Sequence, residues 1–110
     1  MSNTYQIYLI SDSTGETLDR IFLALKAQFS NFNYKIHQCS FTRTENQISK
    51  ILDISKKQKN SIILYTIVNN NLAKFITQES NKFKTPCFGV LEELILSFSK
   101  FRQIPSSLSH

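Results

Sequence analysis

A chain of 110 residues, 41% of them apolar, suffices for one domain with its own core and is too short for two. Its two glycines and two prolines are too few for a disordered chain or a turn-rich all-β fold. The net charge of +5 comes from lysines that are scattered rather than clustered, so we expect no nucleic-acid binding.

The start of the chain does not resemble a secretory leader. Residues 1–4 lead straight into a strand-like run without a basic and apolar signal. The longest apolar run, residues 62–68, is far too short to span a bilayer. We therefore expect a cytoplasmic protein without membrane contact, in which Cys39 and Cys87 stay reduced within core strands.

The first predicted elements are a strand and an amphipathic helix, joined by a turn rich in hydroxyl groups. Residues 5–10 combine aromatic and β-branched side chains, which is typical of a buried strand. Ser13 and Glu16 have the spacing of a capping box, which predicts that the helix begins there. The apolar side chains that we expect on its inward face are Leu18, Ile21, Phe22, Leu25 and Phe29.

A second strand and helix follow. Residues 34–41 alternate imperfectly, which favours an outer strand. Thr44 and Gln47 form another capping box, and the basic run at residues 56–59 suits the end of the helix. The side chains predicted to face inward are Ile48, Ile51, Leu52 and Ser55.

The third and fourth repeats complete the pattern. Residues 61–66 are apolar on both faces, as a buried parallel strand should be. Asn69, Asn70 and Asn71 precede a helix that Pro86 interrupts, and residues 87–90 predict a short last strand. The apolar side chains that this helix carries are Leu72, Phe75, Ile76 and Phe83, and a final helix is predicted to follow with Leu91, Leu94, Ile95 and Phe98.

The order is therefore β-α repeated four times, with connections too long for hairpins. This order predicts an α/β fold: an open parallel sheet of about four strands, with right-handed crossovers and helices on both faces. We expect residues 1–102 to form the domain and residues 103–110 to be a coil tail or the start of a linker.

Polar side chains follow three of the four strands, and parallel strands bring their carboxyl ends to one edge, where ligands bind in open α/β sheets. The turn before the first helix leaves backbone N–H groups free at the positive end of the helix dipole, which suits an anion. A guanidinium in the next loop is a preferred partner for phosphate. The anion-binding candidates are Asp12, Ser13, Thr14, Gly15 and Arg43.

A purely structural role stays open for several of the polar residues at this edge. Helix capping alone accounts for Ser13, Thr14, Thr44 and Asn70. The carboxylate of Asp12 suits a metal ion, a general base or an ion pair with the guanidinium in the next loop.

The remaining chemistry in the sequence is sparse. His37 has no metal-ligand partner at a suitable spacing, and a packed strand histidine is the simpler interpretation. We identify no catalytic residue and no metal site. With glycines at positions 15 and 89 only, neither G-x-G-x-x-G nor G-x-x-x-x-G-K-[ST] occurs.

Taken together, residues 9–17 resemble the opening of the pyruvate, phosphate dikinase regulatory protein family, which includes the phosphoenolpyruvate synthase regulators. The resemblance continues through residues 43–45, residues 64–68 and the Pro86-Cys87 pair, and so covers the chain from Tyr5 to about residue 101. Each motif is weak alone, and their shared order and spacing make the resemblance specific.

The resemblance implies an unusual activity. Members of this family are bifunctional serine/threonine kinases that inactivate a dikinase or synthase by ADP-dependent phosphorylation of a threonine. They remove that group with inorganic phosphate and release pyrophosphate. The implied substrates are ADP and inorganic phosphate, and the implied partner is pyruvate, phosphate dikinase or phosphoenolpyruvate synthase. A homodimer is left open.

The chain departs from the family pattern in two places. The phosphate-binding loop of the family lies in a C-terminal half that has no counterpart here, so no nucleotide-binding residue is carried over. The family's Pro-Gly…His segment appears as residues 105–110, without the glycine. We therefore expect a truncated N-terminal domain that is inactive alone.

Two further functions stay open beside this one. The first is a docking module that recognises the target enzyme. The second is a flavodoxin-like FMN or other phosphate-binding module, because residues 12–17 are close to a hydroxyl-rich phosphate loop. Against the flavin, the chain has no tryptophan and no obvious tyrosine in the later loops to stack on it.

Overall fold

The computed structural model describes residues 4–29, 31, 33–91, 94 and 97. Four parallel strands form one sheet in the order β2-β1-β3-β4, so β1 and β3 lie in the centre. This confirms the parallel α/β fold and the outer position of the second strand. The strands are β1 (Tyr5–Ser11), β2 (Tyr34–Cys39), β3 (Ser61–Thr66) and β4 (Cys87–Gly89).

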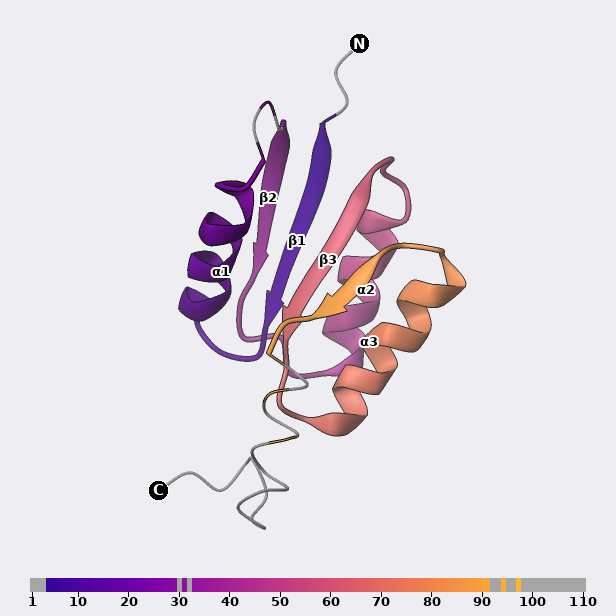
Figure 1. Ribbon diagram of the computed structural model, residues 1–110. Coiled ribbons are helices and arrows are strands. Elements are labelled where there is room, and N and C mark those ends of the chain that lie inside the picture. Colours follow the sequence, from indigo (N-terminus) through magenta and orange to yellow (C-terminus); the bar gives the residue numbers. More distant parts are fainter. Residues whose placement is uncertain (1–3, 30, 32, 92–93, 95–96, 98–110) are drawn as a thin grey trace.

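Among the elements whose bounds the described residues define, three helices cover the two faces of the sheet. In Figure 1, α1 lies on one side, and α2 and α3 lie together on the other. This arrangement confirms the expectation of helices on both faces, with the crossovers of a doubly wound sheet. The helices are α1 (Glu16–Lys26), α2 (Glu45–Ser55) and α3 (Asn70–Lys82).

The core is divided between these two faces, because side chains along a strand alternate from one face to the other. In β1, Ile7 and Leu9 pack towards α1, whereas Tyr8 and Ile10 pack towards the other two helices. The α1 side is completed by Leu18, Phe22 and Leu64, and the opposite side by Ile48, Leu52, Ile63, Tyr65, Ile67, Ala73 and Ile76.

The start of α2 confirms the sequence prediction and that of α3 corrects it by one residue. The Thr44 side chain accepts a hydrogen bond from the Gln47 N–H, and both halves of the capping box are present. At α3 the cap is Asn69, whose side chain accepts from the Leu72 N–H, so the assignment of Asn70 as a cap is wrong. Asn70 is the first helical residue.

The predicted capping box of α1 is wrong. The helix begins at Glu16 after Gly15, which has a left-handed backbone, and no side chain caps it. Ser13 lies two residues earlier, where its N–H donates to Ser11 Oγ and its C=O accepts from the Phe41 N–H. These contacts hold Ser13 in the loop, outside the position from which a side chain can cap α1.

Some predicted boundaries and inward positions also differ. Leu25 and Phe29 are exposed, because α1 ends at Lys26 and its sheet contact is concentrated at Leu18 and Phe22. Three elements are shorter than predicted: β2 ends at Cys39, α3 ends at Lys82 before reaching Pro86, and β4 ends at Gly89. In the predicted final helix, Ile95 and Phe98 lie outside the described residues, as do residues 103–110.

Candidate functional site

The loops after β1, β2 and β3 meet at the carboxyl edge of the sheet, which lies at the lower end of the sheet in Figure 1. The Thr42 N–H donates to the Ser11 C=O at 2.8 Å, and the Asp12 N–H donates to the Thr66 C=O at 3.3 Å. A parallel sheet places these ends together, and the hydrogen bonds then fix one loop against the next. The polar residues singled out in the sequence therefore share one edge.

Gly15 shapes the entry to α1. Its φ of +87° is accessible to glycine, and a Cβ there would lie 3.4 Å from Ser40 Oγ and 3.8 Å from the Ser11 Cβ. The Ser40 hydroxyl donates to the Thr14 C=O at 2.8 Å, which binds this turn to the loop after β2. Since no side chain caps α1, the N–H groups of its first turn face the edge without an intrahelical partner.

Arg43 contacts the loop that leads from β1 into α1. Its Nε donates to the Asp12 C=O at 2.9 Å, and its guanidinium carbon lies 5.2 Å from the centre of the Phe41 ring. The ring contact and the single hydrogen bond orient the guanidinium while its Nη groups remain available for a planar anion. The side chain is exposed.

Asp12 contacts Arg43 through its backbone and not through its carboxylate. The carboxylate Oδ2 instead accepts a hydrogen bond from the Val68 N–H at 3.0 Å, in the loop after β3. The ion pair that the sequence left open is therefore not the contact that forms. The carboxylate joins two loops at the edge.

Ser13 and Thr14 are both exposed. Ser13 Oγ lies 3.2 Å from Ser11 Oγ, and neither Ser13 nor Thr14 caps α1, so helix capping does not explain either residue. Their hydroxyl groups lie on the edge that carries the uncapped helix start.

His37 is the packed strand histidine that the sequence favoured. Its ring stacks on Tyr8, with centroids 4.4 Å apart and planes 11° apart, and its Nε2 lies 2.7 Å from Gln6 Oε1. Burial, helped by the positive charge of Lys35, lowers the pKa of His37. Burial raises the pKa of the Cys39 thiol, and both Cys39 and Cys87 are free.

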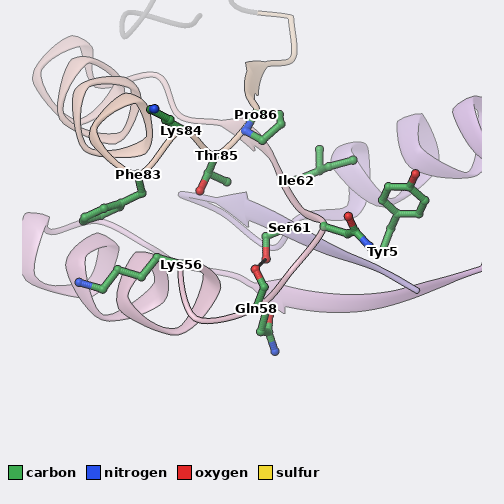
Figure 2. A pocket seen from close by; sticks show the side chains of 10 residues that line it. Tyr5, Lys56, Gln58, Ser61, Ile62, Phe83, Lys84, Thr85 and Pro86 are labelled. Atoms are coloured by element: carbon green, nitrogen blue, oxygen red, sulfur yellow. Dashed lines mark hydrogen bonds between the residues drawn. The ribbon is translucent and has the colours of Figure 1, made fainter. Parts of the chain in front are cut away.

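The opposite, amino edge holds a pocket that the sequence did not predict. It has a volume of about 360 Å³, and Figure 2 shows Lys56, Phe83 and Lys84 along one side of it. Lys56 Nζ lies 4.6 Å from the Phe83 ring centre and 3.3 Å from an Asp53 oxygen. The basic run after α2 was the only sequence signal for this region.

Electrostatics weighs against an anion in this pocket. Both α2 and α3 end here, so their negative dipole ends face it, and the lysines offset that charge. The Ser61 hydroxyl is already used, since it donates to the Ser55 C=O at 2.8 Å. The carboxyl edge, with a positive helix start and a guanidinium, is the better candidate site.

Metal clusters and membrane spans are both absent from the part of the chain that the structure describes. No group of three or more His, Cys, Asp and Glu side chains lies close enough there to hold a metal ion. None of the helices found there is long and apolar enough to cross a membrane.

Comparison with known proteins places the chain in a family. The profile of the family described as kinase/pyrophosphorylase matches residues 7–109. A protein of Pelagibacter ubique named "Putative pyruvate, phosphate dikinase regulatory protein" is 65% identical over 100 residues, which cover 91% of this chain and 36% of the relative. Proteins of the same name from Geotalea uraniireducens and Agrobacterium fabrum are 37% and 36% identical, over 91% and 93% of this chain and 37% of each relative.

The chain thus spans little more than a third of the length of these relatives. The match nevertheless covers almost the whole chain, and it includes the hydroxyl-rich turn after β1 and the loop that carries Arg43. This chain belongs to the kinase/pyrophosphorylase family.

Proposed function

We propose that this chain is the N-terminal, phosphate-recognising part of a cytoplasmic pyruvate, phosphate dikinase regulatory protein. The supporting observation is the uncapped start of α1, preceded by a loop that Arg43 contacts, within a chain that the family profile matches from residue 7 to residue 109. Its partner is a pyruvate, phosphate dikinase or a phosphoenolpyruvate synthase. The flavodoxin-like alternative is set aside because the chain belongs to a kinase/pyrophosphorylase family.

The carboxyl edge contributes anion recognition in this proposal. The first-turn N–H groups of α1 provide hydrogen-bond donors at the positive end of a helix dipole. Arg43 provides a guanidinium whose orientation the Asp12 carbonyl and the Phe41 ring maintain. Together they suit a phosphoryl group, either inorganic phosphate or the phosphate on a threonine of the target enzyme.

The chemistry of phosphoryl transfer needs more than this edge. The family reaction uses ADP as phosphoryl donor in one direction and inorganic phosphate as acceptor in the other. The sequence contains no G-x-x-x-x-G-K-[ST] loop to hold a nucleotide. We therefore assign nucleotide binding and transfer to polypeptide outside these 110 residues, and recognition to the residues within them.

A titration with inorganic phosphate, followed by two-dimensional NMR, tests the recognition step. We expect the amide signals of Gly15, Glu16 and Thr17 to shift, together with the Arg43 side chain, at constant ionic strength. Arg43→Ala should weaken binding at least tenfold, whereas Arg20→Ala on exposed α1 surface should leave it unchanged. Equal affinities of the two variants would remove Arg43 from the site.

An activity assay tests the division of labour. The purified chain is incubated with dikinase and ADP, and then phosphorylated dikinase is incubated with inorganic phosphate. We expect no transfer in either direction, but measurable association with the dikinase that Arg43→Ala weakens. Turnover by the chain alone would contradict the assignment of the transfer step to other polypeptide.

A further inference from the structure

The carboxyl edge carries large apolar side chains as well as polar ones. Phe41, Val68 and Leu91 follow β2, β3 and β4, and their exposed fractions are 51%, 44% and 41%. Exposed apolar residues that gather beside polar groups are typical of an interaction surface, whereas isolated ones are ordinary. We call these three residues, together with Arg43, which stacks on the Phe41 ring, the apolar rim.

Two members of the apolar rim adopt a backbone that their side chains disfavour. Phe41 has φ +55° and Leu91 has φ +67°, in the left-handed region that bulky residues rarely occupy. The other non-glycine positions at positive φ in the described chain are Asn31, Asn60 and Lys84, and asparagine tolerates this conformation. Backbone strain of this kind is found most often at functional sites, where the required direction of a side chain outweighs the energetic cost of the unfavourable φ.

The contacts of the apolar rim hold its side chains outward as a row. Arg43 stacks on Phe41, and the Asp12 carboxylate fixes the Val68 N–H, so adjacent loops support one another. The Val90 N–H donates to the Tyr65 C=O at 2.8 Å, which fixes the chain just before Leu91. The order of the strands spreads the row across the sheet over about 14 Å, three strand spacings.

The side-chain types of the apolar rim indicate the kind of partner that it suits. A row of an aromatic residue, an arginine and two aliphatic residues matches the composition of protein interfaces. The anion-binding turn lies within this row, between the loops of Phe41 and Val68.

We infer that the apolar rim is the surface on which the remaining polypeptide of a family-length protein docks. The chain spans 36% of its 65%-identical relative, so most of a family-length protein lies outside it. Leu91, a member of the rim, lies two residues after the end of β4. Docking there closes the anion site between two parts of the protein. This inference rests on the proposed function.

Hydrogen exchange measured by mass spectrometry tests the inference. One sample is the 110-residue chain, and the other is the Pelagibacter ubique relative with its matched region replaced by this chain. We expect amide exchange in residues 40–44 and 66–69 to slow at least tenfold in the longer protein. The peptide around Leu23, 55% exposed on α1, should exchange alike in both.

Variants of the longer protein sharpen the test. Phe41→Asp should restore fast exchange at residues 66–69, and the matched variant Leu23→Asp should not. Aspartate tolerates positive φ, so Phe41→Asp is not expected to unfold the domain by itself. If the longer protein lacks a single cooperative unfolding transition, exchange is measured on the intact relative over the segments aligned with residues 40–44 and 66–69.

Several outcomes would overturn the inference. Equal exchange of the two loops in both samples would mean that nothing docks on the apolar rim. Protection in the chain alone that grows with concentration would assign the rim to a second copy. Phosphotransfer by the longer protein is assayed separately: protection without activity would contradict the proposed function only, and activity without protection would contradict the docking only.

Discussion

The chain reverses direction at both edges of the sheet, but different residues form the turns at each edge. At the amino edge, Asn31 and Asn60 occupy positive φ at little cost. At the carboxyl edge, the same backbone region is occupied by Gly15, Phe41 and Leu91. Lys84 at the amino edge is also exposed at positive φ, so such a backbone outside asparagine and glycine occurs at both edges. The carboxyl edge differs because its strained residues carry exposed aromatic and aliphatic side chains. The comparison teaches that strain and apolar exposure coincide at the edge where the function is proposed.

The edges also differ in the charge of the helix ends that they present. The helices α1, α2 and α3 all begin at the carboxyl edge, where Thr44 caps α2 and Asn69 caps α3, while α1 has no side-chain cap. The helices end at the amino edge, where Lys56 and Lys84 line a pocket. Free donors at one edge and compensated acceptors at the other are the reason that we propose anion binding at the carboxyl edge.

The largest expected effect on stability comes from a substitution in the turn before α1, at the carboxyl edge. Gly15→Ala forces a Cβ into the left-handed region and against Ser40 Oγ, and should lower the free energy of unfolding by about 1–2 kcal/mol or more. Urea denaturation measures the change. The control is Gly89→Ala, since Gly89 does not have positive φ. Equal losses of unfolding free energy in the two variants would show that the positive φ of residue 15 does not require glycine.

The next effect compares two hydroxyl residues on the same edge. Thr44→Ala deletes the cap of α2 and should cost about 1 kcal/mol of unfolding free energy, measured by urea denaturation. Ser13→Ala serves as its matched control, and we expect little change because Ser13 caps no helix. A loss of unfolding free energy at Ser13 as large as that at Thr44 would indicate that Ser13 does cap α1, against what the structure shows.

A pair of exchanges compares strain at the two edges directly. Asn60→Phe should lower the unfolding free energy by about 1 kcal/mol, because it places a bulky residue at positive φ. Phe41→Asn should change it by less than about 0.5 kcal/mol, since relief of strain offsets the lost ring contact with Arg43. Thermal unfolding of both variants tests the comparison, and a large loss from Phe41→Asn would show that the ring stabilises the fold.

The smallest expected effect on stability is the pH dependence due to His37, which lies within β2 and at neither edge. The pKa of His37 is lowered by burial, so the folded state favours the neutral ring and binds fewer protons than the unfolded chain. The stability due to neutral His37 should be complete above the unfolded pKa of about 6.5 and fall as the pH drops below it. His37→Gln should remove this part of the slope between about pH 7.5 and about pH 5.5. An unchanged slope in urea titrations would assign it to other groups.

Much of the fold followed from local sequence patterns. The run of residues 61–66 predicted the central strand β3, and the Thr44–Gln47 spacing predicted the cap of α2. Both depend on neighbours within a few positions in the chain, where alternation, helical spacing and capping act. Long connections between strands were enough to predict parallel topology and helices on two faces.

The candidate site was only partly predictable. That Arg43 shares an edge with residues 11–15 follows from parallel topology, because the ends of successive strands meet there. That its Nε binds the Asp12 carbonyl, and that Asp12 binds the Val68 N–H, depends on residues 31 and 56 positions apart in the chain. No local pattern records contacts over such separations.

The sequence by itself therefore determined the repeating elements, their parallel order and the edge on which polar residues gather. Only the tertiary structure decided that Ser13 does not cap α1, that Gly15 holds a left-handed turn, and that Phe41 and Leu91 face solvent under strain. The physical reason is that periodicity and capping are local energies, whereas the shape of a loop is set by the loops of other strands beside it. At the carboxyl edge those neighbours come from three separate parts of the chain.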